Sequence, residues 1–250
     1  MRPVLVLGPS LGTSAAALWG PVARLLDDEV EVVGFDLPGH GSSTWTAPAD
    51  LTMADLAAHV LDLLDERGVT TFHYAGDSVG GAIGLQLLLD APQRVRTATL
   101  CCTGARIGTT DSWAERAAQV RASGTPSLVA ASASRWFAPG FLEREPDAGG
   151  ALLRVLSDAA DDGYAAVCHA LGAFDVRDRL GEIAAPVLAV AGAHDVATPP
   201  SSLAEIADGV RDGRLVVLDD VAHLAPIEAP DRVAELLREQ LARHGEGESA

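Results

Sequence analysis

The chain has 250 residues, of which 48% are hydrophobic, so it is long enough and apolar enough to bury a sizeable core. Its formal net charge of −17 would repel nucleic acid and anionic membranes, which argues against a nucleic-acid function. All 18 basic residues are arginine, and this lack of lysine excludes Schiff-base chemistry, a P-loop and a kinase active site.

The chain shows no sign of a membrane segment or a signal peptide. No apolar run approaches the roughly 18 residues needed to span a bilayer. The first apolar run, Val4–Leu7, is too short for the core of a signal peptide. The three cysteines, Cys101, Cys102 and Cys168, have no metal-ligand spacing and are expected to be small buried residues. We therefore predict a soluble, cytoplasmic protein without a disulfide framework or a metal.

The first part of the chain alternates predicted strands with predicted helices. The strands are short apolar runs that end in turn residues, and the helices carry apolar residues three or four positions apart. The strands are expected at residues 4–7, 30–35, 71–75 and 95–101. The helices are expected at 15–26, from Thr52 to Gly68, and at 80–89. Ser14 is a candidate cap of the first helix, which Gly20-Pro21 is expected to interrupt or restart.

After residue 106 the alternation stops and then resumes. Only helical patterns appear between 106 and 180, at 112–122, 127–135, 151–160 and 164–174. Strands then follow at 186–191 and 215–218, and helices at 201–207 and 230–243. Such alternation predicts an α/β fold, a mostly parallel sheet covered by helices on both faces. We predict a core made of residues 1–105 and 181–250, with residues 106–180 inserted as a helical lid over the carboxyl ends of the strands.

The stretch Gly76-Asp77-Ser78-Val79-Gly80 is a G-x-S-x-G sequence between a predicted strand and a predicted helix, the context that this motif requires. The glycines on either side of Ser78 let neighbouring chain approach without a Cβ clash. The hydroxyl would then stand at a helix N-terminus, whose dipole favours developing negative charge. The sequence predicts that Ser78 is a nucleophile.

A nucleophilic serine needs a base, and His223 is the best placed of the seven histidines. It follows the predicted strand at 215–218, so its loop emerges at the same edge of the sheet as Ser78. We predict that His223 is the base.

The base needs a carboxylate that orients it, and Asp195 follows the predicted strand at 186–191. The order serine, aspartate, histidine along the chain is the one expected of this type of fold. Four other aspartates compete for this role: Asp219 and Asp220 beside the histidine, and Asp175 and Asp178 in the predicted lid.

An acyl-transfer site also needs two N–H donors for the oxyanion. The backbone N–H of Val79, directly after the nucleophile, is one candidate. The second is expected from the loop after the first strand, where Leu11 is the first choice and Ser10 the next, because Pro9 has no N–H. Histidines and cysteines lack ligand spacing, and no dinucleotide-binding motif follows a strand, so we predict no metal and no cofactor.

Several motifs resemble those of the α/β-hydrolase superfamily, and more closely those of the 3-oxoadipate enol-lactonases. The motifs shared with the superfamily are Ser10-Leu11-Gly12-Thr13-Ser14, Asp36-Leu37-Pro38-Gly39-His40-Gly41, Gly76-Asp77-Ser78-Val79-Gly80-Gly81 and Gly192-Ala193-His194-Asp195. The motifs similar to the lactonase lid are Ile107-Gly108-Thr109, Arg135-Trp136-Phe137-Ala138-Pro139-Gly140-Phe141 and Gly163-Tyr164-Ala165-Ala166-Val167-Cys168.

This resemblance implies hydrolysis of 3-oxoadipate enol-lactone to 3-oxoadipate, a step in the catabolism of aromatic compounds by the β-ketoadipate pathway. The partner would be a small anionic lactone, which a protein of this charge should repel. We therefore expect Arg135 to supply local positive charge for the substrate carboxylate and Trp136 to form an apolar wall. The family also normally has a β-hairpin before the first strand, so either the antiparallel edge of the sheet is missing here or the chain start is truncated.

Other activities are compatible with the same residues. The protein could be another carboxylester, thioester or carbon–carbon-bond hydrolase, or a cofactor-free perhydrolase. An epoxide hydrolase or dehalogenase is disfavoured, because those enzymes have an aspartate where Ser78 stands. From a different class, a ligand receptor built on a hydrolase fold remains an alternative.

Overall fold

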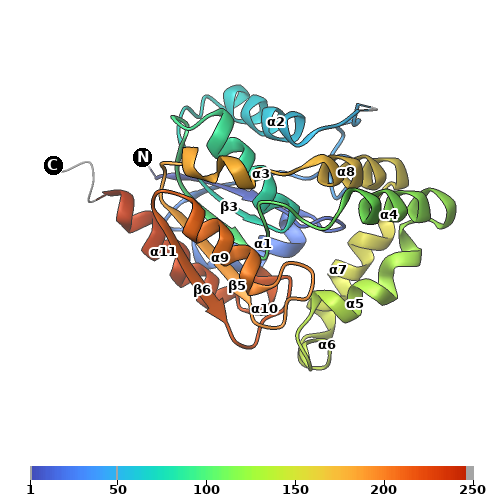
Figure 1. The fold of residues 1–250 in the computed structure, drawn as a ribbon. Coiled ribbons are helices and arrows are strands. Elements are labelled where there is room, and N and C mark those ends of the chain that lie inside the picture. The colour runs from blue at the N-terminus through green and yellow to red at the C-terminus, as the bar shows by residue number, and fades with distance from the viewer. Residues whose placement is uncertain (1, 49, 246–250) are drawn as a thin grey trace.

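The sheet at the centre of the molecule has six strands, all parallel (Figure 1). The computed structural model describes residues 2–48 and 50–245. The strands lie in the order β2-β1-β3-β4-β5-β6. Their bounds are Val4–Gly8 (β1), Glu31–Gly34 (β2), Phe72–Asp77 (β3), Val95–Cys101 (β4), Val187–Gly192 (β5) and Gly213–Leu218 (β6).

The burial of each strand matches its place in the sheet. Every residue of β3 and of β5 is buried, because helices cover both faces of these inner strands. In β6, at one edge, buried or partly buried residues alternate with exposed ones. The functional loops follow β3, β5 and β6, so they meet at the carboxyl edge of the sheet.

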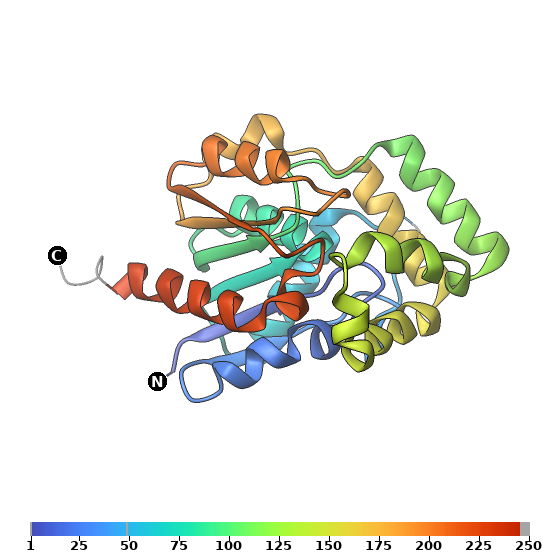
Figure 2. The same ribbon diagram turned by 90° about the horizontal axis from the view of Figure 1, so that it is seen from below.

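Helices cover the two faces of the sheet, as predicted (Figure 2). One face carries α1 (Ala15–Leu25) and α11 (Pro230–Gly245). The other face carries α2 (Met53–Glu66), α3 (Val79–Asp90) and α9 (Pro200–Gly209). Thr52 caps α2 with a capping box: its hydroxyl accepts from the Asp55 N–H, and the Asp55 carboxylate accepts from the Thr52 N–H.

The first helix differs from the sequence-based expectation at one point. Ser14 is its N-cap, with the hydroxyl accepting from the Ala17 N–H. The expectation that Gly20-Pro21 interrupts the helix is wrong, because α1 continues through Pro21. The buried side chains of Leu18, Trp19 and Val22 hold this helix against the sheet, and that packing outweighs the local cost of an internal proline.

Between β4 and β5 the chain forms only helices, which we call the helical segment (residues 110–173). It lies beyond one end of the sheet in both views (Figures 1 and 2). Its α-helices are α4 (Thr110–Ser123), α5 (Val129–Trp136), α6 (Phe141–Arg144), α7 (Pro146–Asp158) and α8 (Asp161–Ala173). Short 3₁₀ turns occupy Thr125–Leu128 (η1) and Arg177–Glu182 (η2).

One hydrophobic cluster runs from the sheet into the helical segment. It contains Leu5 and Val190 from strands as well as Leu152 and Tyr164 from helices α7 and α8. The thiols of Cys101, Cys102 and Cys168 are free and buried. Burial raises the pKa of each thiol, that of Cys168 to about 12.

The α/β class, the parallel sheet and the cover of helices on both faces are confirmed. The division into a core and a lid stays a prediction. In the described residues no strand precedes β1, and β2 forms the edge of the sheet on that side. None of the helices described here is long and apolar enough to cross a membrane.

Candidate active site

Ser78 occupies a sharp turn between β3 and α3. Its φ of 55° and ψ of −116° lie where non-glycine residues are strained. Three bonds hold the backbone there: the Ser78 N–H donates to the Cys101 carbonyl (2.9 Å), and the Ser78 carbonyl accepts from the Thr103 hydroxyl (2.6 Å) and the Ala82 N–H (3.1 Å). The turn therefore stores strain that the surrounding structure compensates.

The glycines of the motif make this turn possible. A Cβ on Gly76 would lie 2.3 Å from the carbonyl oxygen of Gly80, and a Cβ on Gly80 would lie 2.5 Å from that of Gly8. Both distances are shorter than any real contact, so only glycine fits at these positions.

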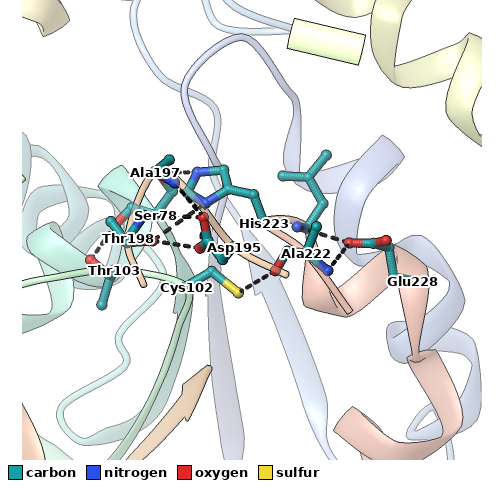
Figure 3. A network of polar contacts seen from close by, with 10 residues as sticks. Ser78, Cys102, Thr103, Asp195, Ala197, Thr198, Ala222, His223 and Glu228 are labelled. Atoms are coloured by element: carbon teal, nitrogen blue, oxygen red, sulfur yellow. Dashed lines mark hydrogen bonds and ion pairs between the residues drawn. The ribbon is translucent and has the colours of Figure 1, made fainter. Parts of the chain in front are cut away.

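The imidazole of His223 lies between Ser78 and Asp195 (Figure 3). Its Nε2 is 2.9 Å from the Ser78 Oγ, and its Nδ1 is 2.8 Å from the Asp195 Oδ2. Ser78 is 8% exposed, His223 5% and Asp195 3%, so bulk water does not compete for these hydrogen bonds. A neutral imidazole that donates from Nδ1 to the carboxylate can accept the serine proton at Nε2. The structure thus brings together the three side chains predicted from the sequence.

The Asp195 carboxylate is fixed by its own turn. Its Oδ1 accepts from the N–H groups of Ala197 (2.8 Å) and Thr198 (3.0 Å), and its Oδ2 accepts from the Thr198 hydroxyl (2.6 Å). Thr198 is a functional candidate that our sequence reasoning missed. Its signal was a hydroxyl three positions after the carboxylate, a spacing at which side chain and backbone bond locally.

The competing aspartates do not reach the imidazole. Asp219 and Asp220 are exposed, and Asp178 is exposed in η2. The exposed Asp175 instead pairs with the guanidinium of Arg177 at 2.7 Å.

The predicted oxyanion donors belong to the start of α3 and to the loop between β1 and α1. Val79 is the first residue of α3, so its N–H is one of those that a helix leaves without a partner inside the helix. Leu11 lies in the loop between β1 and α1. This loop is tied to α3, because the Gly80 N–H donates to the Pro9 carbonyl at 3.0 Å. The role of Val79 and Leu11 as oxyanion donors stays a prediction.

A buried carboxyl group, Asp77, and a partly buried one, Glu228, lie near the triad and were not predicted. Burial, followed by the charges of Asp195 and Glu228, raises the pKa of Asp77 well above its usual range. Neither oxygen of Asp77 has a hydrogen-bond partner among the described residues, which fits a neutral carboxyl group. Burial also raises the pKa of Glu228, while hydrogen bonds from the N–H groups of Ala138, Ala222 and Leu224 oppose that rise.

Trp136, predicted to line the substrate site, lies beside the catalytic loops. Its carbonyl accepts from the His223 N–H at 3.1 Å. Its ring packs against the loop that carries Leu11, since a Cβ on Gly12 would lie 3.3 Å from it. The ring is buried, and its role as an apolar wall of the substrate site stays a prediction.

Arg135 is half-buried in α5 and lies within the electrostatic influence of a second guanidinium, that of Arg116, which the sequence did not reveal. Burial, together with the like charge of Arg116 from α4, lowers the pKa of Arg135. Burial raises the pKa of the Tyr164 phenol in α8 to about 12, and the charges of Arg116 and Arg135 oppose that rise. In the described part of the chain, neither arginine forms an ion pair with a carboxylate. Two cations gathered without a counter-charge are a candidate site for an anion.

Comparison with known proteins agrees with this arrangement. The model of the alpha/beta hydrolase fold family matches residues 3–141, more than half of the chain. The chain belongs to the α/β-hydrolase family. It is 33% identical to 3-oxoadipate enol-lactonase 2 of Acinetobacter baylyi, an alignment that covers 92% of this chain and 85% of that protein.

Two further relatives are an enol-lactonase of known structure and a putative carbamate hydrolase. The crystal structure of the enol-lactonase from Burkholderia xenovorans LB400 superposes with a TM-score of 0.92 at 33% identity, covering 97% of this chain and 92% of the other. A putative carbamate hydrolase RutD of Variovorax paradoxus is 32% identical, over 88% of this chain and 84% of that protein. The resemblance to enol-lactonases is confirmed, and the chain is a hydrolase. Its relatives are named for two different substrate classes, enol-lactones and carbamates.

Proposed function

We propose that this hydrolase opens 3-oxoadipate enol-lactone to 3-oxoadipate by a serine acyl-enzyme mechanism. The observation that carries the proposal is the hydrogen-bonded chain from Ser78 through His223 to Asp195, in a protein one-third identical to enol-lactonases. The reaction would take place in the cytoplasm, as part of aromatic catabolism, with the helical segment as lid and without a cofactor.

The first half of the reaction acylates the serine. The Ser78 Oγ forms a bond to the lactone carbonyl carbon as its proton passes to Nε2 of His223. The N–H groups of Val79 and Leu11 stabilise the oxyanion of the tetrahedral intermediate. As the intermediate collapses, the ring C–O bond breaks and an enolate leaves. The stabilised enolate leaves easily, takes the proton from Nε2 of His223 and becomes a ketone, which returns the imidazole to its neutral form.

The second half releases the product. A water molecule gives a proton to His223 and attacks the acyl carbon. The bond from that carbon to the Ser78 Oγ then breaks, and the imidazolium returns its proton to the serine oxygen. Asp195 accepts the Nδ1 hydrogen bond throughout, which stabilises the charged imidazole and keeps it oriented.

The substrate carries a free carboxylate, and the paired guanidinium groups of Arg135 and Arg116 would bind it. A planar guanidinium bonds a carboxylate through two parallel N–H···O bonds. These two cations supply local positive charge in a protein whose net charge is −17. They also favour an anionic lactone over a neutral ester.

A carbamate is the second candidate substrate, because relatives named as putative carbamate hydrolases are also about one-third identical. The same triad would attack a carbamate carbonyl. The guanidinium groups of Arg135 and Arg116 favour the lactone, because its free carboxylate is an anionic group apart from the reacting carbonyl, and a simple carbamate has no such group.

Turnover of the enol-lactone by purified protein, followed by loss of its ultraviolet absorbance, tests the proposal. A p-nitrophenyl ester and a carbamate are assayed beside it. We expect the lactone to have the highest kcat/KM, and Ser78→Ala to lose at least about 1,000-fold in kcat. Ser201→Ala, an exposed serine on α9, serves as the matched control and should retain wild-type turnover. A wild-type protein that prefers the carbamate, or a fully active Ser78→Ala protein, would refute the proposal.

A further inference from the structure

Glu228 stands at the end of α10 (Ala225–Glu228), the short helix that follows His223. Its Oε1 accepts from the N–H groups of Ala222 (2.9 Å) and Leu224 (3.4 Å), the two residues that flank His223. Figure 3 shows its carboxylate on the side of this loop that faces away from Ser78. Glu228 therefore holds the backbone on both sides of the base without touching the reacting atoms.

The second oxygen of the same carboxylate reaches another part of the fold. Oε2 accepts from the Ala138 N–H at 2.6 Å, in the loop that follows α5. Two residues earlier, the Trp136 carbonyl accepts from the N–H of His223 itself at 3.1 Å. The three consecutive N–H groups of residues 222–224 are thus all bonded, two to Glu228 and one to the helical segment.

These contacts explain why a charged side chain occupies a partly buried position. Burial opposes the ionised form of Glu228, but three N–H groups donate to its two oxygens. A carboxylate has about four acceptor sites and no donor, so it can serve all three N–H groups at once. An apolar side chain would leave three N–H groups without this acceptor, and an amide would present a donor to at least one of them.

We propose that Glu228 is the positioning residue that holds His223 in line with Ser78 by joining the His223 loop to the helical segment. The imidazole is then placed to accept the Ser78 proton only when Trp136 and Ala138 make their hydrogen bonds to His223 and Glu228. This inference goes beyond the proposed function, because it concerns the geometry of the base and holds for any acyl substrate of the triad.

The test compares Glu228→Gln and Glu228→Asp with the wild type. In Glu228→Gln the NH₂ group must face either Ala138 or the pair Ala222 and Leu224, so one connection is lost whichever way the amide turns. Glu228→Asp keeps the charge but is one methylene shorter, so it cannot span both sides. Glu235→Gln, an exposed glutamate paired with Arg232 on α11, is the matched control.

The readouts are kcat and KM for a p-nitrophenyl ester and the rate at which a fluorophosphonate labels Ser78. We expect both Glu228 variants to lose about 10-fold to 100-fold in kcat and in labelling rate, because a small displacement of a catalytic group is costly. KM should change less than about twofold, because an interaction lost only in the transition state lowers kcat. The control should match the wild type, and circular dichroism at the assay temperature gives the folded fraction by which each rate is divided.

Unchanged kcat per folded molecule in Glu228→Gln, or full activity in Glu228→Asp, would overturn the inference. If Glu228→Gln does not fold, Glu228→Asp decides by the same thresholds. A wild type that reacts with the ester and the fluorophosphonate but not with the lactone leaves this inference intact and refutes the proposed substrate. A wild type in which Ser78 reacts with neither refutes both.

Discussion

At the scale of single residues, the site combines a strained serine with a neighbouring carboxyl group that has no hydrogen-bond partner in the described part of the chain. The strain at Ser78 is compensated by its bonds to Cys101, Ala82 and Thr103. Asp77, one position earlier, is fully buried below the same turn, and burial raises its pKa. Its proton therefore links the stability of the nucleophile turn to pH.

Asp77→Asn should become increasingly stabilising relative to the wild type as the pH rises. The folded protein keeps the Asp77 proton at pH values where the unfolded chain, with an aspartate pKa of about 3.9, has lost it. Below pH 4 the Asp77 carboxyl group does not reduce the free energy of unfolding. Above pH 4 the free energy of unfolding of the wild type falls by up to about 1.4 kcal/mol per pH unit, until the pH reaches the raised pKa of Asp77. Asparagine has no such proton to lose. Urea unfolding at pH 4.5, 6 and 7.5 measures the gap between the two proteins.

Asp55→Asn provides a control of opposite sign. The hydroxyl and N–H of Thr52 lower the pKa of Asp55, so its ionised form stabilises the folded protein above pH 4. The Asn variant at position 55 should therefore lose stability relative to the wild type as pH rises toward about 4, and that gap should stay constant from pH 4.5 to 7.5, where the Asp55 carboxyl group is ionised in both states. A gap for Asp77→Asn that stays constant with pH would show that this carboxyl group titrates alike in both states.

At the scale of elements, helices α4, α5 and α8 place two cations and a buried phenol together. The partial burial of Arg135 and the like charge of Arg116 both oppose the charge on Arg135. An arrangement that is unfavourable without an anion favours the binding of one. Under the proposed function, these helices would therefore supply the anion-binding part of the substrate site.

Arg116→Leu and Arg135→Leu should each raise KM for the enol-lactone by about 10-fold or more, because a hydrogen bond to a charged group is worth about 1.5–3 kcal/mol. Turnover of a neutral p-nitrophenyl ester should keep its KM. Arg154→Leu, an exposed arginine on α7, removes the same charge elsewhere on the helical segment and should leave both KM values unchanged. Equal losses for the charged and the neutral substrate would show that the two arginines only support the fold.

At the scale of the whole molecule, the sheet and the helical segment share one hydrophobic cluster and are joined through Trp136, Ala138 and Glu228. We therefore expect calorimetry to show a single unfolding transition, with a van't Hoff enthalpy close to the calorimetric one. Two resolved transitions would contradict this expectation. They would also show that the predicted core, 1–105 with 181–250, and the predicted lid, 106–180, unfold as separate domains.

Much of this architecture could be predicted from the sequence because buried parallel strands are short, continuous apolar runs. All six observed strands begin and end within two residues of those expected. The three side chains of the triad could be predicted because each follows a strand whose carboxyl end lies at one edge of the sheet. Helices α6 and α10 were missed because four residues are too few to show a helical period.

The supporting residues were missed for a different reason. Glu228 bonds to Ala138 across 90 positions of the chain, and the charge of Arg116 acts on Arg135 from a different helix. Neither contact leaves a local pattern in the sequence. Thr198 could have been found, since it bonds to a carboxylate only three positions away.

The three buried thiols can report local unfolding of this protein through their rates of alkylation. While folded, Cys101, Cys102 and Cys168 are shielded and protonated, so a thiol reagent has no thiolate to attack. The rate at which each cysteine is alkylated would measure how often its region opens to solvent. Cys168 marks helix α8, whereas the other two mark the end of central strand β4 and the residue after it. Modification of Cys168 ahead of the pair would reveal a segment that lifts away while the sheet stays closed.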